Sequence, residues 1–195
     1  MSNATNDAVS NNDPYVIISA DTHAELPTEL YRPYIDPEFK DEFEDFLKQK
    51  EAEMRAGGMS DEDFAKQWFE QHGEGVSGGW DPTQRDKELD GDGICGEVIF
   101  PDADAVTGVA GAPFGAGLGQ SGDLDPRQAM AGARAHNRWL AELCGTNPDR
   151  RRGVAVIPAI FDVDAAVAET KRAYESGVRG DRKSTRLNSS HRLLS

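Results

Sequence analysis

The chain has 195 residues, which is enough for one domain with its own hydrophobic core. Its net charge of −14 argues against nucleic acid or an anionic membrane as a partner. No stretch approaches the roughly 20 apolar residues that a transmembrane helix requires. The polar residues 1–14 predict a flexible leader without the apolar core of a signal peptide. Cys95 and Cys144 lie far apart in apolar segments, which predicts two buried thiols in a cytoplasmic protein.

Strands and helices are predicted to alternate along residues 15–180. The β-branched run at 15–20 predicts a first strand that is buried on both faces. Two further apolar runs, at 97–101 and 153–158, predict the second and third strands. Helices are expected at 36–55, at 60–72, from Asp125-Pro126 to Cys144, and from Asp162 onward.

The last two predicted helices carry apolar stripes that indicate which face turns inward. In the first of them the stripe is Ala129, Ala133, His136, Leu140 and Leu143. In the second it is Val163, Val167, Thr170 and Tyr174. The basic run at 150–152, which precedes the third strand, predicts a solvated turn.

This order of apolar strands and helices is typical of parallel βαβ units. Two architectures fit the order: an open doubly wound sheet and a (β/α)₈ barrel. Because a complete barrel typically needs about 250 residues, three strands cannot close one. The fold prediction is therefore α/β, the N-terminal portion of a (β/α)₈ TIM barrel with about three of its eight strands. Its domain would span residues 15–180.

The final residues differ in composition from the rest of the chain. Residues 181–195 carry four basic residues against one acidic residue and show no apolar period. Residues 181–191 resemble the translation of a short-read sequencing adapter. We therefore predict that 181–195 is an artefact, leave it out of the fold prediction, and expect the chain to be a truncated fragment.

Asp21-Thr22-His23 is the pattern with the most chemistry. Side chains alternate along a strand, so Asp21 and His23 are expected to point the same way at the end of the first strand. In a barrel that is the mouth where catalytic groups gather. A carboxylate and an imidazole are both good ligands for Zn²⁺. The alternative is an aspartate that caps a turn beside a surface histidine.

Other candidate residues follow the second predicted strand. Asp102 and Asp104 are candidates for substrate binding, although turn aspartates are the simpler interpretation. Residues 117–122 match G-x-G-x-x-G, but they lie too far from a strand for a dinucleotide site and predict a loop over the barrel mouth. His72 is expected to be a helix cap or an exposed residue, and His136 a half-buried residue of the apolar stripe.

Three segments resemble the amidohydrolase-related family that contains the ACMSD-like decarboxylases. They are VIISADTHAELPTELYRPYIDPEF, RDKELDGDGICGEVIFPD and AHNRWLAELCGTNPDRRRGVAVIP. The resemblance implies a barrel that holds a divalent metal, usually zinc, and that hydrolyses or decarboxylates a small carboxylate. It implies Asp21 and His23 as metal ligands, with Asp21 standing where many members have a first histidine. The family's remaining ligands have no counterpart in this chain.

Two other functions are kept open. The chain as given is expected to be a non-catalytic fragment, because two ligands are too few for a stable catalytic zinc site. An open α/β nucleotide-binding module would need a glycine-rich turn after the first strand, and residues 20–23 contain no glycine. The catalytic proton-transfer residue stays unknown. A small-molecule carboxylate is the expected partner, with a homo-oligomer open for the full-length protein.

Overall fold

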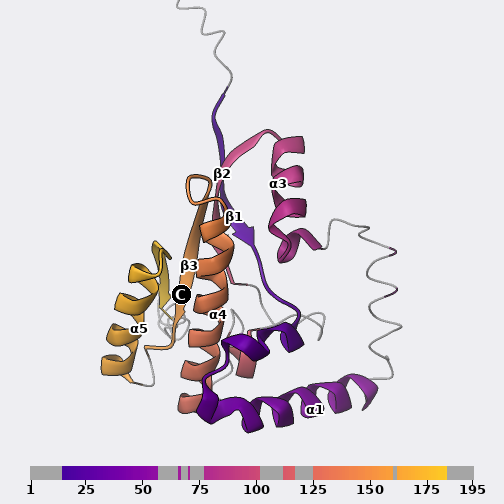
Figure 1. Cartoon of the computed structure of the whole chain (residues 1–195), viewed down its shortest axis with the longest axis vertical. Coiled ribbons are helices and arrows are strands. Elements are labelled where there is room, and N and C mark those ends of the chain that lie inside the picture. The colour runs from indigo at the N-terminus through magenta and orange to yellow at the C-terminus, as the bar shows by residue number, and fades with distance from the viewer. Residues whose placement is uncertain are drawn as a thin grey trace, which may run out of the picture.

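The computed structural model describes residues 15–56, 66, 70, 77–101, 112–116, 125–159 and 162–183. Four parallel strands form one sheet in the order β1-β2-β3-β4 (Figure 1). The strands are β1 (Ile17–His23), β2 (Ile94–Phe100), β3 (Arg151–Ile157) and β4 (Gly180–Lys183). The prediction of a parallel α/β fold is therefore confirmed, with strands that begin two or three residues earlier than expected at β2 and β3.

Helices connect the strands. After β1 come the 3₁₀ helices η1 (Thr28–Tyr34) and η2 (Pro37–Phe39) and the helix α1 (Lys40–Ala56). The later helices are α3 (Pro82–Gly91), η4 (Pro113–Gly115), α4 (Pro126–Thr146) and α5 (Val163–Glu175). Figure 1 shows α1 across the end of the molecule towards which β1 points, and α4 alongside β3. Most of the predicted helix at 60–72 lies outside the described residues.

The described strands follow one another in space as they do in sequence. The doubly wound orders 3-2-1-4-5-6 and 2-1-3-4-5 both contain a reversal, and nucleotides bind at that reversal. The order β1-β2-β3-β4 contains none. The described part of the sheet therefore lacks the reversal of strand order at which doubly wound proteins bind nucleotides.

Helices α3 and α4 cover the same face of this sheet. Glu97 of β2 pairs in register with Arg151 of β3, so the two side chains share a face. Glu97 accepts from Arg85 of α3, and Arg151 donates to Thr146 of α4. At Gly153 an added Cβ would lie 2.8 Å from Leu140 Cγ, so α4 packs directly on the backbone of β3.

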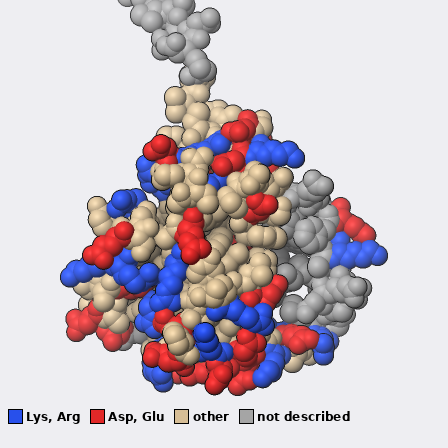
Figure 2. All heavy atoms as spheres, in the orientation of Figure 1, with Lys and Arg blue, Asp and Glu red and all other residues tan. Residues whose placement is uncertain are grey.

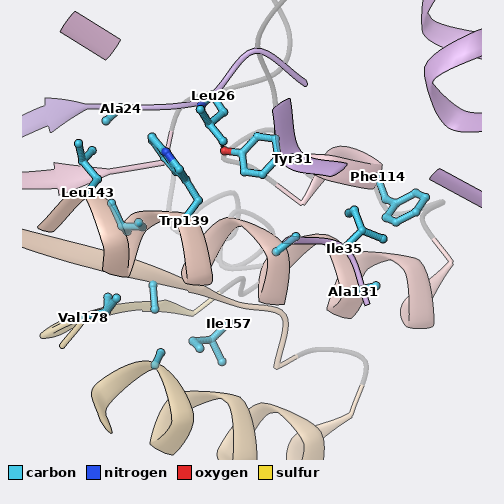
Figure 3. Close-up of a cluster of buried hydrophobic side chains, with 14 of the residues drawn as sticks. Ala24, Leu26, Tyr31, Ile35, Phe114, Ala131, Trp139, Leu143, Ile157 and Val178 are labelled. Carbon is cyan, nitrogen blue, oxygen red and sulfur yellow. The ribbon is translucent and has the colours of Figure 1, made fainter. Parts of the chain in front are cut away.

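Helix α4 forms the centre of the core. Asp125 caps it by accepting from the backbone N–H of Arg127 at 2.7 Å, and Pro126 occupies the first turn. The predicted stripe is confirmed, because all of its members are buried: Ala129, Ala133, His136, Leu140 and Leu143. Figure 3 shows Trp139 and Leu143 extending towards Ala24 and Leu26, with Tyr31 beside them.

Asn137 of α4 takes the place of a strand neighbour for β3. Its side chain donates to the carbonyl of Val156 at 3.0 Å and accepts from the N–H of Val156 at 2.8 Å. The pairing between β2 and β3 runs only from Glu97↔Arg151 to Ile99↔Gly153. Val156 lies further along β3 than the last residue that pairs with β2. The Asn137 amide therefore hydrogen-bonds the N–H and the carbonyl of Val156, which β2 does not reach.

The predicted inward face of α5 is wrong. Val163, Val167 and Tyr174 are exposed. The buried side chains of this helix are Ala166, Glu169 and Ala173. Two alanines let α5 approach the core closely, and Glu169 accepts a hydrogen bond from Asn137 at 2.6 Å. The predicted cap is confirmed, since Asp162 accepts from Ala165 N at 2.9 Å.

Strand β1 is more exposed than expected. Tyr15, Val16, Ile17 and Ile18 are all exposed, so the prediction of a strand buried on both faces is wrong. The reason is that β1 lies at an edge of the described sheet and pairs only with β2 there. Cys95 is also exposed, contrary to expectation. Cys144 is buried as predicted, and burial raises the pKa of its thiol to about 11.

Strand β4 extends into the segment that the sequence analysis excluded from the fold. It pairs Val154↔Gly180 through Ile157↔Lys183, so the backbone of 181–183 adds a strand that the fold prediction did not include. A parallel ladder uses backbone groups that every residue except proline supplies. The pairing therefore leaves the adapter origin of the tail a prediction.

On the face shown in Figure 2, acidic and basic side chains are interspersed. Several of them form exposed ion pairs, such as Arg32–Glu44 at 2.7 Å. Among the residues that the structure describes, no helix is both long and apolar enough to cross a membrane.

Candidate functional site

Asp21 and His23 lie together at the carboxyl end of β1. His23 Nε2 is 3.6 Å from Asp21 Oδ1, and the side chains are 39% and 82% exposed. Thr22, between them, points to the opposite face, where its hydroxyl meets Glu97. A register irregularity between Ser19 and Thr22 includes Asp21 itself. Such bulges often re-aim side chains beside functional sites. The expectation that Asp21 and His23 share a face is confirmed.

The backbone of β2 orients the His23 ring. His23 Nδ1 is 3.0 Å from the carbonyl oxygen of Pro101. A carbonyl oxygen can only accept, so this hydrogen bond requires the proton on Nδ1 and leaves the lone pair of the neutral ring on Nε2. That nitrogen is the one nearest Asp21. Metal-binding histidines are commonly oriented by this kind of bond from the other ring nitrogen.

The distance between the two acceptor atoms suits a shared cation. At 3.6 Å, Nε2 and Oδ1 are too far apart for a good hydrogen bond. Two ligands that each lie about 2.0–2.2 Å from a tetrahedral Zn²⁺ are about 3.3–3.6 Å from one another. The donor set and its spacing therefore fit a divalent metal without rearrangement. Two such side chains are fewer than the four ligands of a tetrahedral site.

A buried ionic cluster lies behind this pair, on the face covered by the helices. Glu97, whose side chain is 0% exposed, accepts from Arg85 Nε at 2.8 Å and from Nη2 at 2.7 Å. Arg151, also 0% exposed, has its Nε 3.5 Å from Glu97 and donates to Asp86 at 2.7 Å. Two arginines thus face two carboxylates, and burial of these charges is compensated by pairing.

The position of Arg151 corrects the prediction for the basic run at 150–152. This run was expected to be a solvated turn. Arg151 instead belongs to β3 and is buried, while Arg152 is exposed. Arg150 donates to Asp90 at 2.7 Å. Sequence spacing gives little warning of this, because the acidic partners of Arg151 lie far away on α3 and β2.

His136 is fully buried rather than half-buried as predicted. Its Nδ1 is 3.0 Å from the hydroxyl of Tyr31, which is equally buried, and its Nε2 makes no hydrogen bond within the described part of the chain. Burial lowers the pKa of His136 to about 4, so the ring is neutral at pH 7. Burial also raises the pKa of Tyr31 well above its usual value. Both groups are therefore uncharged and form part of the core.

The remaining candidates cannot be placed. Asp102, Asp104, His72 and the loop at 117–122 lie outside the described residues. Within the described residues, no group of three or more His, Cys, Asp or Glu side chains could hold a metal ion. Sequence reasoning missed Arg85, Glu97 and Arg151, although a charged residue that begins or interrupts an apolar strand signals a buried pair.

No protein-family model matches the chain, and no curated protein matches it.

Proposed function

We propose that this chain carries part of the active site of a metal-dependent hydrolase or decarboxylase of the amidohydrolase-related type. Its substrate would be a small carboxylate, and zinc is the metal that the donor types favour. The observation that carries the proposal is the Asp21–His23 pair, 3.6 Å apart, with the His23 ring oriented by the Pro101 carbonyl. The sequence resemblance described above supports the same two ligands.

The sheet supports a barrel as the setting of this site. Its four strands are parallel and sequential, as consecutive strands of a (β/α)₈ barrel are. Apolar side chains are exposed at both limits of the sheet, on β1 and on α5, where a closing barrel would cover them: Ile17, Ile18, Val163, Val167 and Tyr174. We propose that β1, β2 and β3 are the first three strands of such a barrel, and that β4 occupies the place of the fourth.

A bound divalent metal would lower the pKa of a water molecule or polarise a substrate oxygen. Asp21 would balance part of the metal charge, and His23 would offer Nε2 while Pro101 keeps its ring in place. The exposure of Asp21 leaves room for a substrate at the site. The proposal keeps the cytoplasmic location predicted from the sequence, with which two free cysteines agree. It also keeps a small molecule, rather than nucleic acid or a membrane, as partner.

The test is titration of the full chain with Co²⁺ and Zn²⁺, which measures affinity by calorimetry and ligand type by the Co²⁺ absorption spectrum. Asp21→Asn and His23→Gln should each weaken binding by at least tenfold, since the first replaces a charged carboxylate by a neutral amide and the second removes the imidazole nitrogen. Asp41→Asn on α1 is the matched control for loss of an exposed acidic residue and should bind as the unmodified chain does. Equal affinity in all four proteins would contradict the proposal.

A second expectation concerns catalysis by the chain as given. The described residues supply two ligands, and a catalytic zinc site keeps three with an open fourth position. We propose that this chain therefore turns over no carboxylate substrate, even with metal bound. Incubation with a panel of aromatic and aliphatic carboxylates tests this, with release of CO₂ and hydrolysis products as the readout. Turnover lost in His23→Gln would show that the missing ligands are present after all.

A further inference from the structure

The candidate ligands Asp21 and His23 belong to a strand that lies at the edge of the described sheet, so something must hold its end in place. Thr22 separates them and turns its side chain to the opposite face. Its hydroxyl is 3.0 Å from both Val98 O and Glu97 Oε2 and can donate to one of them. It also accepts from Arg85 Nη2 at 3.2 Å. The middle residue of the D-T-H pattern is thus an anchor.

All the N–H groups of the Arg85 guanidinium donate to residues at the carboxyl end of β1 or next to it. Its Nε and Nη2 form the paired contact with Glu97, and Nη2 also reaches Thr22. Its Nη1 donates to the carbonyl of His23 at 3.1 Å and to that of Gly78 at 2.9 Å. These contacts match the five N–H donors of a guanidinium. Arg85 therefore binds the backbone of one candidate ligand and the side chain of its neighbour.

We infer that Thr22, Arg85 and Glu97 form a positioning unit that fixes Asp21 and His23 at the spacing a metal needs. This inference rests on the proposed function for its metal, but not for its geometry. The paired contact with the fully buried Glu97 fixes the plane of the Arg85 guanidinium. That plane fixes the His23 carbonyl and the Thr22 hydroxyl. Loss of the anchor would let the end of β1 turn and break the bond between His23 Nδ1 and Pro101.

The first experiment substitutes Thr22→Val, which removes the hydroxyl and keeps the β-branched shape. Loss of such supporting contacts typically weakens metal binding about 10–100-fold, and we expect a rise of that size in the Co²⁺ dissociation constant. Thr22→Ser restores the hydroxyl and should restore affinity. Thr170→Val is the matched control, because Thr170 also donates to a backbone carbonyl, at 2.8 Å, but lies on α5.

The second experiment needs no metal. Long-range ¹H–¹⁵N spectra report which ring nitrogen of a histidine carries the proton, and His23→Gln identifies the His23 signals. In the unmodified chain and in Thr22→Ser, His23 should hold its proton on Nδ1. In Thr22→Val we expect a mixture in which the Nε2-protonated form gains. Arg85→Lys should act in the same direction, because lysine cannot make the paired contact. Thr22→Val keeps the test available where Arg85→Lys does not fold.

The outcomes separate the inference from the function on which it rests. Unchanged Co²⁺ affinity and an unchanged His23 tautomer in Thr22→Val would overturn the positioning unit and leave the proposed function standing. A tautomer change in Thr22→Val, in a chain whose Co²⁺ binding ignores Asp21→Asn and His23→Gln, would support the unit and overturn the metal site. A loss of thermal stability in Thr22→Val with both readouts unchanged would mark Thr22 as merely structural.

Discussion

The two faces of the parallel sheet differ in what surrounds their charged side chains. On the face covered by α3 and α4, Glu97 and Arg151 are fully buried, and each lies beside groups of opposite charge: Arg85 for Glu97 and Asp86 for Arg151. On the other face, Asp21 and His23 are exposed and share a spacing that suits a third, positively charged species. One strand end can therefore contact both environments, because Thr22 faces the buried charges while Asp21 and His23 face solvent.

The largest effect is expected from breaking the buried face at Glu97. Glu97→Gln keeps the shape but leaves Arg85 and Arg151 without their shared carboxylate. Removing one partner of a buried ion pair typically costs about 3–5 kcal/mol, and we expect a loss of that size in the free energy of unfolding measured with urea. Arg32→Gln, which breaks the exposed pair with Glu44, is the control and should cost far less. Equal losses would show that burial of Glu97 adds nothing to the contribution of its ion pair.

Acid should lower the free energy of unfolding through His136, which is buried in α4. Its pKa is about 4 in the folded chain and about 6.5 in an unfolded one, so between these values the unfolded state binds more protons. The contribution of neutral His136 to the unfolding free energy is therefore fully present above about pH 6.5. It falls by about 3 kcal/mol as the pH drops to about 4. His136→Asn can still pair with Tyr31 but does not titrate. Unfolding free energies at pH 7 and 4 should fall by about 3 kcal/mol less in this variant.

A close approach between α4 and the backbone of Pro113 should give the next largest change in stability. At Gly132 of α4 an added Cβ would collide with the carbonyl oxygen of Pro113. Gly132→Ala should therefore cost about 1–3 kcal/mol, the usual penalty of overpacking. Gly145, in the same helix, has nothing within 4 Å of its added Cβ. Gly145→Ala should stabilise by about 0.5–1 kcal/mol. Thermal unfolding of both variants measures the difference, and equal melting temperatures would contradict it.

The smallest change in stability is expected on the open face. Asp21 is 82% exposed, and substitutions of such surface residues usually change the unfolding free energy by less than about 0.5 kcal/mol. Asp21→Asn should therefore unfold at nearly the same urea concentration as the unmodified chain, while its Co²⁺ affinity falls. A large loss of stability in this variant would show that Asp21 serves the fold and would argue against a role in metal binding.

Much of the fold was predictable because it depends on local patterns. The parallel strands and α4 follow from apolar runs and from the Asp125-Pro126 cap. The same cap signal, Asp81-Pro82, begins α3, which the sequence analysis did not predict. The inward face of α5 could not be read from hydrophobicity, because Glu169 is buried by its bond to Asn137 of another helix. An apolar stripe predicts a face suited to burial but does not identify what covers it.

Only the Asp21–His23 part of the candidate site was predictable from the sequence. Alternation along a strand placed Asp21 and His23 together, and the structure confirms this. The support behind them was not visible, because Arg85 and Glu97 are 62 and 74 residues from His23 along the chain and read as surface charges. Only the folded sheet shows that the register places Glu97 opposite Ser19 and beside Thr22. Long-range ionic pairing is set by topology rather than by local composition.

The side chain of Asn137 has a consequence for how the chain opens. Because the Val156 amide donates to a helix and not to a strand, its protection from hydrogen exchange depends on α4 staying in place. The same side chain holds Glu169 of α5. We therefore expect the Val156 amide to exchange together with the amides of α4, at a rate unaffected by separation of β2 from β3. Helices α4 and α5 and strand β3 would then form one cooperative unit that opens and closes as a whole.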